Sequence, residues 1–419
     1  MKYCLQQVQI IDAQSKHHLK KRDILIDNGI ITDIAPTIQS DKKTKTINFN
    51  HSYASVGFCD LYTQLGDPGN EHREDTESIS KAASFGGFTT LCAIANNVPI
   101  TQNKSQIEYI INQSKNTATT ILPIGAITQN FDGKTPTEMI DMHKAGAIAF
   151  ADIPNSINDE GVFLRALQYV KSFNGLIIDL PYIHNLTNDA CINESALAVK
   201  MGLKGIPNIA EYMAVEKAIA LLKYTDSKLH LTGISCKESV DLIAKAKKDG
   251  LNISCSVFVH HLIDNENAVA NYQANYKVFP PLRSEKDQKA LLKAVKDGTI
   301  DAIATQHTPL DTEAKATEFE YAQYGMIALE TCFSLLNTYT DIPLERIIDA
   351  LSYQPYKIIN KEFSINNNSI SNLSIFSIDE EWTVPTIFKS KSNNSPYIGK
   401  KLKGKVKAVF NKNQIFINE

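Results

Sequence analysis

Two patterns of hydrophobic and polar residues divide the chain. From residue 54 onward, short apolar runs rich in β-branched residues alternate with segments that have helical spacing. The predicted strands are 56–65, 88–94, 120–126, 145–150, 176–180, 228–232, 252–257 and 300–304. The predicted helices are 75–85, 105–114, 160–171, 209–223, 238–248 and 285–296, with two more at 326–338 and 344–352. This alternation predicts a (β/α)8 barrel, and a doubly wound open sheet is the structural alternative.

Both ends of the chain read as strands instead. Residues 24–31 place Asn28-Gly29 between two apolar arms, a strong hairpin signal. The tail has strand patterns at 373–378, 405–410 and 414–417. Neither end has enough strands to be stable alone. We therefore expect residues 1–53 and 365–419 to build one small β-sandwich beside a barrel formed by residues 54–364.

Composition excludes several classes of protein. The 419 residues include 43 basic and 46 acidic ones, a net charge of −3 without long blocks of one sign, so neither nucleic acid nor an anionic membrane is an expected partner. No apolar run approaches the ~18 residues of a membrane span, and the N-terminus has no apolar signal core. The cysteine count of 7 is odd and no Cys-x-x-Cys occurs, which favours the reducing cytoplasm over a disulfide framework.

Candidate chemistry lies where the predicted strands end, because barrels carry their sites there. The first strand ends at Tyr62 and Gln64, and the second is followed by Asn96. Further polar groups at strand ends are Asp152, His230, His260, His261, Gln306 and His307.

Many ordered motifs then resemble one family. They include Gly57-Phe58 with Asp60-Leu61, Asp67-Pro68-Gly69, Glu74-Asp75, Gly86-Gly87-Phe88-Thr89-Thr90, Gly205-Ile206-Pro207, Ala210-Glu211, Ser235, His260-His261-Leu262, Pro280-Pro281-Leu282-Arg283, Asp297-Gly298-Thr299 and Ser395-Pro396. The chain resembles dihydroorotases, which group with allantoinases and dihydropyrimidinases in the amidohydrolase superfamily. The resemblance covers nearly the whole chain.

The resemblance implies a zinc centre that hydrolyses a cyclic amide, yet this chain departs from it at the ligands. The positions of the family's metal ligands carry Tyr62, Gln64, Leu180, Gly233 and Gln306, which we call the metal-ligand positions. Leu and Gly have no donor atom in the side chain, and Gln cannot take up a proton at neutral pH. Asp152 is the only retained candidate ligand, and Ile153 follows it where a second Asp is usual.

Positions implied to bind substrate are altered as well. Gly66 replaces an arginine that would hold a substrate carboxylate, Phe279 replaces an asparagine, and Leu310 replaces a histidine. Asn96 and His307 are retained.

Each polar candidate also has a plain structural interpretation. Four histidines could form a rebuilt metal site, but core histidines with satisfied hydrogen bonds are the simpler interpretation, and His260 and His261 would point to opposite faces of a strand. Tyr62 and Gln64 could be a metal-free catalytic pair or could fill the vacated space by bonding to each other. Asp152 could hold a cation or be paired with a lysine or water. The basic run 400–403 could be a docking patch or a solvated face.

These patterns predict a non-catalytic dihydroorotase homologue without a cofactor. The resemblance implies a role in pyrimidine biosynthesis as a partner of aspartate carbamoyltransferase or of an intact dihydroorotase, in a homo- or hetero-oligomer. The alternatives are an active dihydroorotase or related cyclic-amide hydrolase with an atypical site, and an interaction protein outside pyrimidine synthesis.

Overall fold

A parallel barrel forms the centre of the molecule. The computed structural model describes residues 1–187 and 189–418. The barrel strands are β6 (Phe58–Thr63), β7 (Phe88–Ala93), β8 (Thr120–Gly125), β9 (Ala149–Phe150), β10 (Ile177–Asp179), β13 (Leu229–Leu231), β14 (Ile253–Phe258) and β15 (Ala302–Ala304). They pair in parallel in chain order, as the prediction of a (β/α)8 barrel requires. The alternative of an open sheet is excluded by contacts between its two edge strands.

Those contacts join β6 to β15. The amide of Gln64 donates to the carbonyl of His307 at 3.0 Å. The Asp60 carboxylate accepts from the Thr305 amide at 2.8 Å and from its hydroxyl at 2.6 Å. Removing this buried carboxylate would leave its donors unpaired at a large cost in free energy. Asp60 therefore fixes how β6 and β15 align where the barrel closes.

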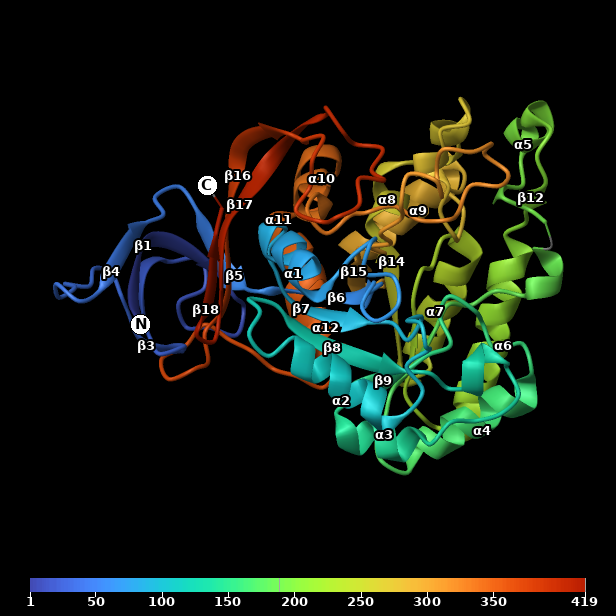
Figure 1. Cartoon of the computed structure of the whole chain (residues 1–419), viewed down its shortest axis with the longest axis horizontal. Helices are drawn as coiled ribbons and strands as arrows, with labels where there is room; N and C mark the ends of the chain where they lie inside the picture. Colours follow the sequence, from blue (N-terminus) through green and yellow to red (C-terminus); the bar gives the residue numbers. More distant parts are fainter. Residues whose placement is uncertain (188, 419) are drawn as a thin grey trace.

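Helices cover the outside of the barrel (Figure 1). They are α1 (Thr76–Phe85), α2 (Lys104–Gln113), α3 (Met139–Ala145), α4 (Glu160–Lys171), α6 (Ile209–Thr225), α7 (Lys237–Lys248), α9 (Glu285–Lys296), α10 (Cys332–Tyr339), α11 (Leu344–Ile348) and α12 (Gln354–Ile358). A π-helical turn, Asp349–Tyr353, joins α11 to α12. Shorter elements extend the loops: β11 (Ile192–Asn193), α5 (Ala196–Met201), β12 (Gly205–Ile206) and α8 (Val259–Ile263).

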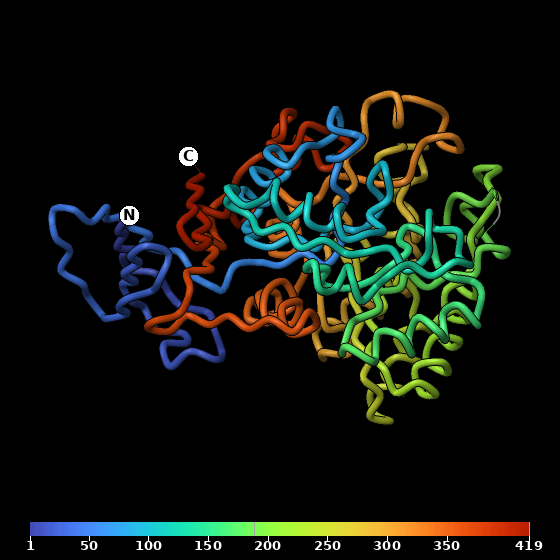
Figure 2. The backbone as a smooth tube through the Cα atoms, turned by 60° about the horizontal axis from the view of Figure 1, so that its bottom comes forward, coloured from blue at the N-terminus to red at the C-terminus, as the bar shows by residue number. Residues whose placement is uncertain are grey.

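Both chain ends enter a second sheet. Its strands are β1 (Lys2–Ile11), β2 (Lys21–Asp27), β3 (Ile30–Ala35), β4 (Lys45–Asn48), β5 (Tyr53–Val56), β16 (Asn372–Thr383), β17 (Lys401–Asn411) and β18 (Gln414–Ile417). The two ends meet where β5 pairs with β16. Both termini lie at this end of the molecule (Figures 1 and 2). The predicted Asn-Gly hairpin is confirmed, since β2 and β3 pair around Asn28 and Gly29, which have φ of 46° and 77°.

Some predicted boundaries are wrong for local reasons. Residues 145–148 end helix α3 and do not form a strand, because Gly146 adopts a left-handed φ of 112° that terminates the helix. Residues 326–331 are not helical. Met326 pairs with His307 beside β15, so burial against the barrel explains the apolar run there.

Candidate functional site

The five metal-ligand positions meet at the carboxyl end of the barrel. Tyr62 lies near the end of β6 and Gln64 directly follows it, Leu180 follows β10, Gly233 follows β13, and Gln306 follows β15. Burial raises the pKa of the Tyr62 hydroxyl to about 12, and the nearby side-chain amides of Gln64 and Gln306 oppose that rise. The sequence therefore identifies a real spatial group, and Tyr62 stays protonated across the physiological range.

An apolar cluster fills the space between these positions. The Tyr62 ring packs edge-on against Phe258, with centroids 5.0 Å apart. A Cβ at Gly233 would lie 2.6 Å from Phe258 Cε2 and 2.7 Å from Leu180 Cδ1, so neither neighbour leaves room for a larger residue. All of these side chains are buried.

These residues do not fit a zinc ion. Zinc needs several nitrogen, sulfur or carboxylate donors around one point, and Leu180 and Gly233 offer none. Nowhere in residues 1–187 and 189–418 do three or more His, Cys, Asp or Glu residues gather in a way that could hold a metal. No catalytic step can be derived through a metal from this set of side chains.

Gln306 occupies the position where the family's proton-shuttling aspartate is expected. Its backbone has a left-handed φ of 51°. The side-chain amide donates to the carbonyl of Phe279, and its Oε1 has no partner within the described residues. An amide cannot accept a proton at neutral pH, so Gln306 orients groups but cannot serve as a general base.

Asp152 anchors a loop. One carboxylate oxygen accepts from the amides of Ile127 and Thr128 at 2.8 and 2.9 Å, and the other accepts from the Thr128 hydroxyl. The expectation that Asp152 is paired with a lysine or with water is therefore wrong. Burial raises the pKa of Asp152 and these bonds oppose that shift. With this set of donors the carboxylate holds the segment after β8 against β9.

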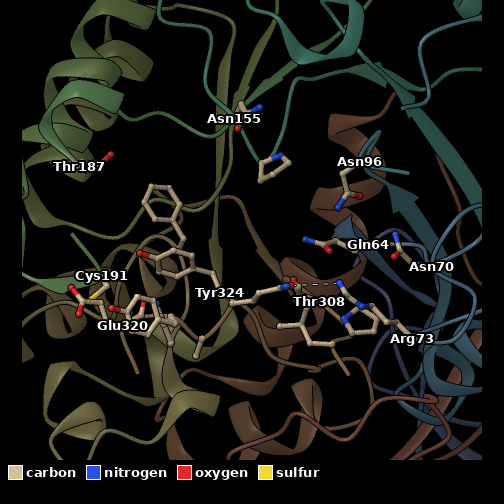
Figure 3. Close-up of a pocket in the computed structure, with 18 of the residues that line it drawn as sticks. Gln64, Asn70, Arg73, Asn96, Asn155, Thr187, Cys191, Thr308, Glu320 and Tyr324 are labelled. Atoms are coloured by element: carbon tan, nitrogen blue, oxygen red, sulfur yellow. Dashed lines mark hydrogen bonds between the residues drawn. The ribbon is translucent and has the colours of Figure 1, made fainter. Parts of the chain in front are cut away.

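The positions implied to bind substrate divide into two groups. Asn96, Phe279 and Leu310 line a cavity of about 1050 Å³ at the mouth of the barrel, which we call the mouth cavity (Figure 3). Gly66 also lines it, but a Cβ there would lie 2.0 Å from the carbonyl oxygen of Glu74 and 2.6 Å from that of Asn70. The backbone therefore excludes the arginine that the resemblance implies.

His307 lies behind this cavity and contacts Glu74. Its Nδ1 accepts from the Ala328 amide at 3.2 Å, so Nε2 carries the proton and donates to Glu74 Oε2 at 3.4 Å. Glu74 also accepts from Ser390, which ties the segment before β17 to the barrel. His307 thus has a structural role in this chain.

The other three histidines are buried and neutral. His230 bonds to Ser254 and Ser256 at 2.9 and 3.0 Å, and burial lowers its pKa to about 3. His261 Nε2 donates to the carbonyl of Pro280 at 3.1 Å, and burial lowers its pKa to about 4.

His260 differs from them. The expectation that His260 and His261 lie on opposite faces of a strand is wrong, because β14 ends at Phe258 and both residues lie in helix α8, with rings 4.7 Å apart. Neither ring nitrogen of His260 has a hydrogen-bond partner in the described part of the chain, although the side chain is fully buried. Burial lowers its pKa well below the ordinary value.

Sequence reasoning missed one acidic group near the site. Asp179 ends β10, directly before Leu180, and burial raises the pKa of its carboxyl to about 7, with nearby Asp152 adding to the rise and Lys217 opposing it. Its nearest donor is the Ser156 hydroxyl at 3.4 Å. An acidic residue at the end of an apolar strand was the available signal.

The motifs that carry the resemblance meet in a buried ionic network. Arg283 lies 3.8 Å from Glu211, and both side chains are 2% exposed. Glu211 also accepts from the Ser235 and Cys236 amides at 3.0 and 3.2 Å, and Arg283 donates to the Ile206 carbonyl at 2.6 Å. Residues far apart in the sequence therefore hold three segments together: β12 with the start of α6, the loop after β13, and the loop before α9.

The barrel with its second sheet has the same fold as solved hydantoinase structures. It matches an L-hydantoinase from Arthrobacter aurescens with a TM-score of 0.86 and 18% identity, covering 99% of this chain and 96% of that one. A D-hydantoinase structure matches with a TM-score of 0.85 and 20% identity, covering 100% and 95%. At this level of identity the likeness concerns the fold.

Sequence comparison identifies the family. A dihydro-orotase-like family model matches residues 54–239. A dihydroorotase from Caldanaerobacter subterraneus is 37% identical over 402 residues, 94% of this chain and 93% of that protein. One from Elusimicrobium minutum is 36% identical over 419 residues, 98% and 96% of the two chains. The chain belongs to the dihydroorotase-like family. Among the described residues, no helix has the length and apolar character needed to cross a bilayer.

Proposed function

We propose that this protein acts in pyrimidine biosynthesis as a dihydroorotase homologue that has lost its metal centre. One observation carries the proposal: Leu180, Gly233 and Phe258 pack where metal ligands would converge. Water activation needs a metal, and proton transfer needs a titratable group at the position of Gln306. Neither function has a candidate side chain there.

The proposed role is structural support of aspartate carbamoyltransferase in a cytoplasmic hetero-oligomer. The family resemblance supplies this partner, and an intact dihydroorotase is the other candidate. The chain has the buried Glu211–Arg283 network, which organises loops of the barrel, although it lacks the metal ligands. This contrast supports a role that depends on the fold and not on metal chemistry.

Two measurements test the loss of chemistry. Elemental analysis after expression with added zinc is expected to give well under one equivalent, with an active dihydroorotase treated identically as the control. Hydrolysis of dihydroorotate and cyclisation of carbamoyl aspartate are expected to stay at background for the wild type and for Gln306→Ala. Tightly bound zinc, or turnover that Gln306→Ala abolishes, would replace this proposal with catalysis.

The partner has its own test. The protein is mixed with aspartate carbamoyltransferase from the same organism, and separately with that organism's intact dihydroorotase, and sized by light scattering. A larger species is expected with the transferase. Unchanged masses in both mixtures would remove the structural role and leave the absence of chemistry standing.

An active hydrolase with an atypical site is the second candidate. It is favoured by His260 and Gln306, which bury polar atoms that have no hydrogen-bond partner within the described residues. Buried unpaired polar atoms are uncommon in structures without a functional reason. The activity assays above separate this candidate from the first, with His260→Phe as a further variant that would lose any turnover.

A further inference from the structure

The mouth cavity has two chemically different walls. Side-chain amides of Gln64, Asn70 and Asn96 lie on one side, and Tyr324 lies on the other (Figure 3). Its volume of about 1050 Å³ is at the upper end of the range for small-molecule sites, roughly 300–1,000 Å³. The loss of metal donors has therefore not closed the space above them.

The amide wall has unused hydrogen-bonding capacity. Within residues 1–187 and 189–418, the side chains of Asn70 and Asn96 make no hydrogen bond, and the Gln64 amide lies near the Tyr62 hydroxyl. Asn96 is half-buried, so its amide has limited access to bulk water. Each amide offers a donor and an acceptor side by side, the arrangement that pairs with an N–H next to a C=O on a ring.

The opposite wall is aromatic. Tyr182 and Phe279 are in edge-to-face contact with centroids 4.7 Å apart, and Phe279 meets Tyr324 at 5.7 Å. The planes of neighbouring rings lie at 74° and 73° to each other, so a planar ring can stack on the face of one ring and meet the edge of the next. Stacking of this kind recognises heterocyclic bases without depending on charge.

The cations around the cavity are already engaged. Arg73 donates to Asp311 at 2.6 Å, and Lys204 pairs with Asp189 at 3.4 Å. Lys277 donates to the Glu320 carbonyl at 2.7 Å and lies 4.8 Å from the Tyr324 ring centroid. The described lining therefore offers no uncommitted cation for a carboxylate, and the backbone at Gly66 leaves no space to add one.

We propose that the mouth cavity binds a neutral nucleobase, as the free base or within a nucleoside, and holds it without turnover. The base edge pairs with Asn96 and Gln64, and its face packs against Phe279 and Tyr182. The room beyond the base suits a ribose. Only the absence of turnover rests on the proposed function, because binding itself needs no metal.

Isothermal titration of the full chain tests this site. The probes are uracil, cytosine, adenine, uridine and orotate, and orotate serves as the carboxylate-bearing probe. At least one base or nucleoside is expected to bind at micromolar concentration, at least tenfold more tightly than orotate. A base that binds more tightly than its nucleoside identifies the free base as the source, and the reverse order identifies the nucleoside.

Variants locate the site. Asn96→Leu and Phe279→Ala are each expected to weaken binding at least tenfold. Asn112→Leu is the matched control, since Asn112 is an exposed amide on α2 outside the cavity, and it should bind as the wild type does. Thermal melting of each variant shows whether it is folded, and Tyr182→Phe, which keeps the ring, is expected to retain binding.

Several results would overturn the inference. These are no binding of any base at millimolar concentration, orotate binding as tightly as the bases, or affinity unchanged in both Asn96→Leu and Phe279→Ala. Chromatography of the probes after incubation separates the two proposals: ring opening would refute the proposed function, whereas absence of binding with no turnover would refute this inference alone.

Discussion

Gly233 lies directly against Phe258. A Cβ at Gly233 would come within 2.6 Å of Phe258 Cε2, and the glycine has a left-handed φ of 69°. Both the backbone and the neighbouring ring therefore require glycine where the family's metal centre would need a histidine. The centre of the barrel top is packed like a core, so single reverse substitutions meet a steric barrier as well as missing ligands.

Gly233→Ala should test this packing. The left-handed backbone alone costs an alanine roughly 1–2 kcal/mol, and overpacking adds about 1–3 kcal/mol. Gly202 is the matched control, because its φ is 68° and nothing lies within 4 Å of a Cβ there. Chemical denaturation of both variants should show a larger loss of unfolding free energy for Gly233→Ala. Equal losses would mean that the centre is loosely packed.

The sequence predicted the barrel because its signal is periodic and repeated. Strands and helices alternate, and helices such as α4 and α9 show a clear apolar stripe that fixes both ends. The helix α5 has only six residues and α3 only seven, too few to establish a period, and the apolar run 145–150 that follows α3 suits a strand over its whole length. Short elements between strands were therefore missed.

The candidate site was predictable by position but not by contact. Motif spacing predicts that Tyr62 and Gln306 lie together, and in the structure the Gln306 amide is close enough to Tyr62 to lower the pKa of its hydroxyl. The partner of Asp152 is Thr128, 24 residues away, and no local pattern reveals that pairing. Phe258 ends its strand like any core residue, so its role in filling the centre appears only in three dimensions.

Asp152→Ala should destabilise a loop. The change leaves the amides of Ile127 and Thr128 unpaired in a buried place, at about 1–3 kcal/mol for each donor. Asp132→Ala is the control within the same loop, because the exposed Asp132 accepts comparable amide bonds in contact with water. The melting temperature should fall much further for Asp152→Ala than for Asp132→Ala. New sites of proteolytic cleavage should also appear within residues 127–137.

A different result for Asp152→Ala would contradict this loop role. If Asp152→Ala kept wild-type stability and instead reduced the zinc content of protein prepared with excess metal, the carboxylate would be a ligand. The loop role would then be wrong.

Arg283→Leu should be among the most damaging substitutions. It leaves the buried Glu211 side chain without its cation, and breaking a buried pair in this way costs about 3–5 kcal/mol. Lys289→Ala removes one partner of the exposed pair with Glu285 and should cost below about 0.5 kcal/mol. The denaturant concentration at the midpoint of unfolding, measured for both variants, tests this difference. Similar midpoints for the two variants would show that the buried network contributes little.

Asp179 should make stability depend on pH in an identifiable window. Burial raises the pKa of its carboxyl to about 7 in the folded chain from an ordinary 3.8. As pH rises from about 4 to about 7, the unfolded chain releases this proton first, so the folded state binds more protons and its stability falls. Above about 7 both states are ionised and the penalty is constant. Lys217 faces the carboxyl and lowers its pKa, Asp152 raises it, and Ser156 donates a bond at 3.4 Å.

Asp179→Asn removes the ionisation while keeping an oxygen for Ser156. We therefore expect it to be more stable than the wild type above pH 7, by up to roughly 4 kcal/mol, with the advantage shrinking toward zero as pH falls to 4. The difference between variant and wild type at each pH cancels the contribution of Glu330, whose pKa is also raised to about 7 by burial. Asp189→Asn, at a carboxylate with 82% of its side chain exposed, should give a flat difference. Urea denaturation from pH 4 to 9 measures both curves. A stability difference for Asp179→Asn that does not change with pH would mean that the carboxyl titrates near its ordinary value, and that water reaches the strand end beside Leu180.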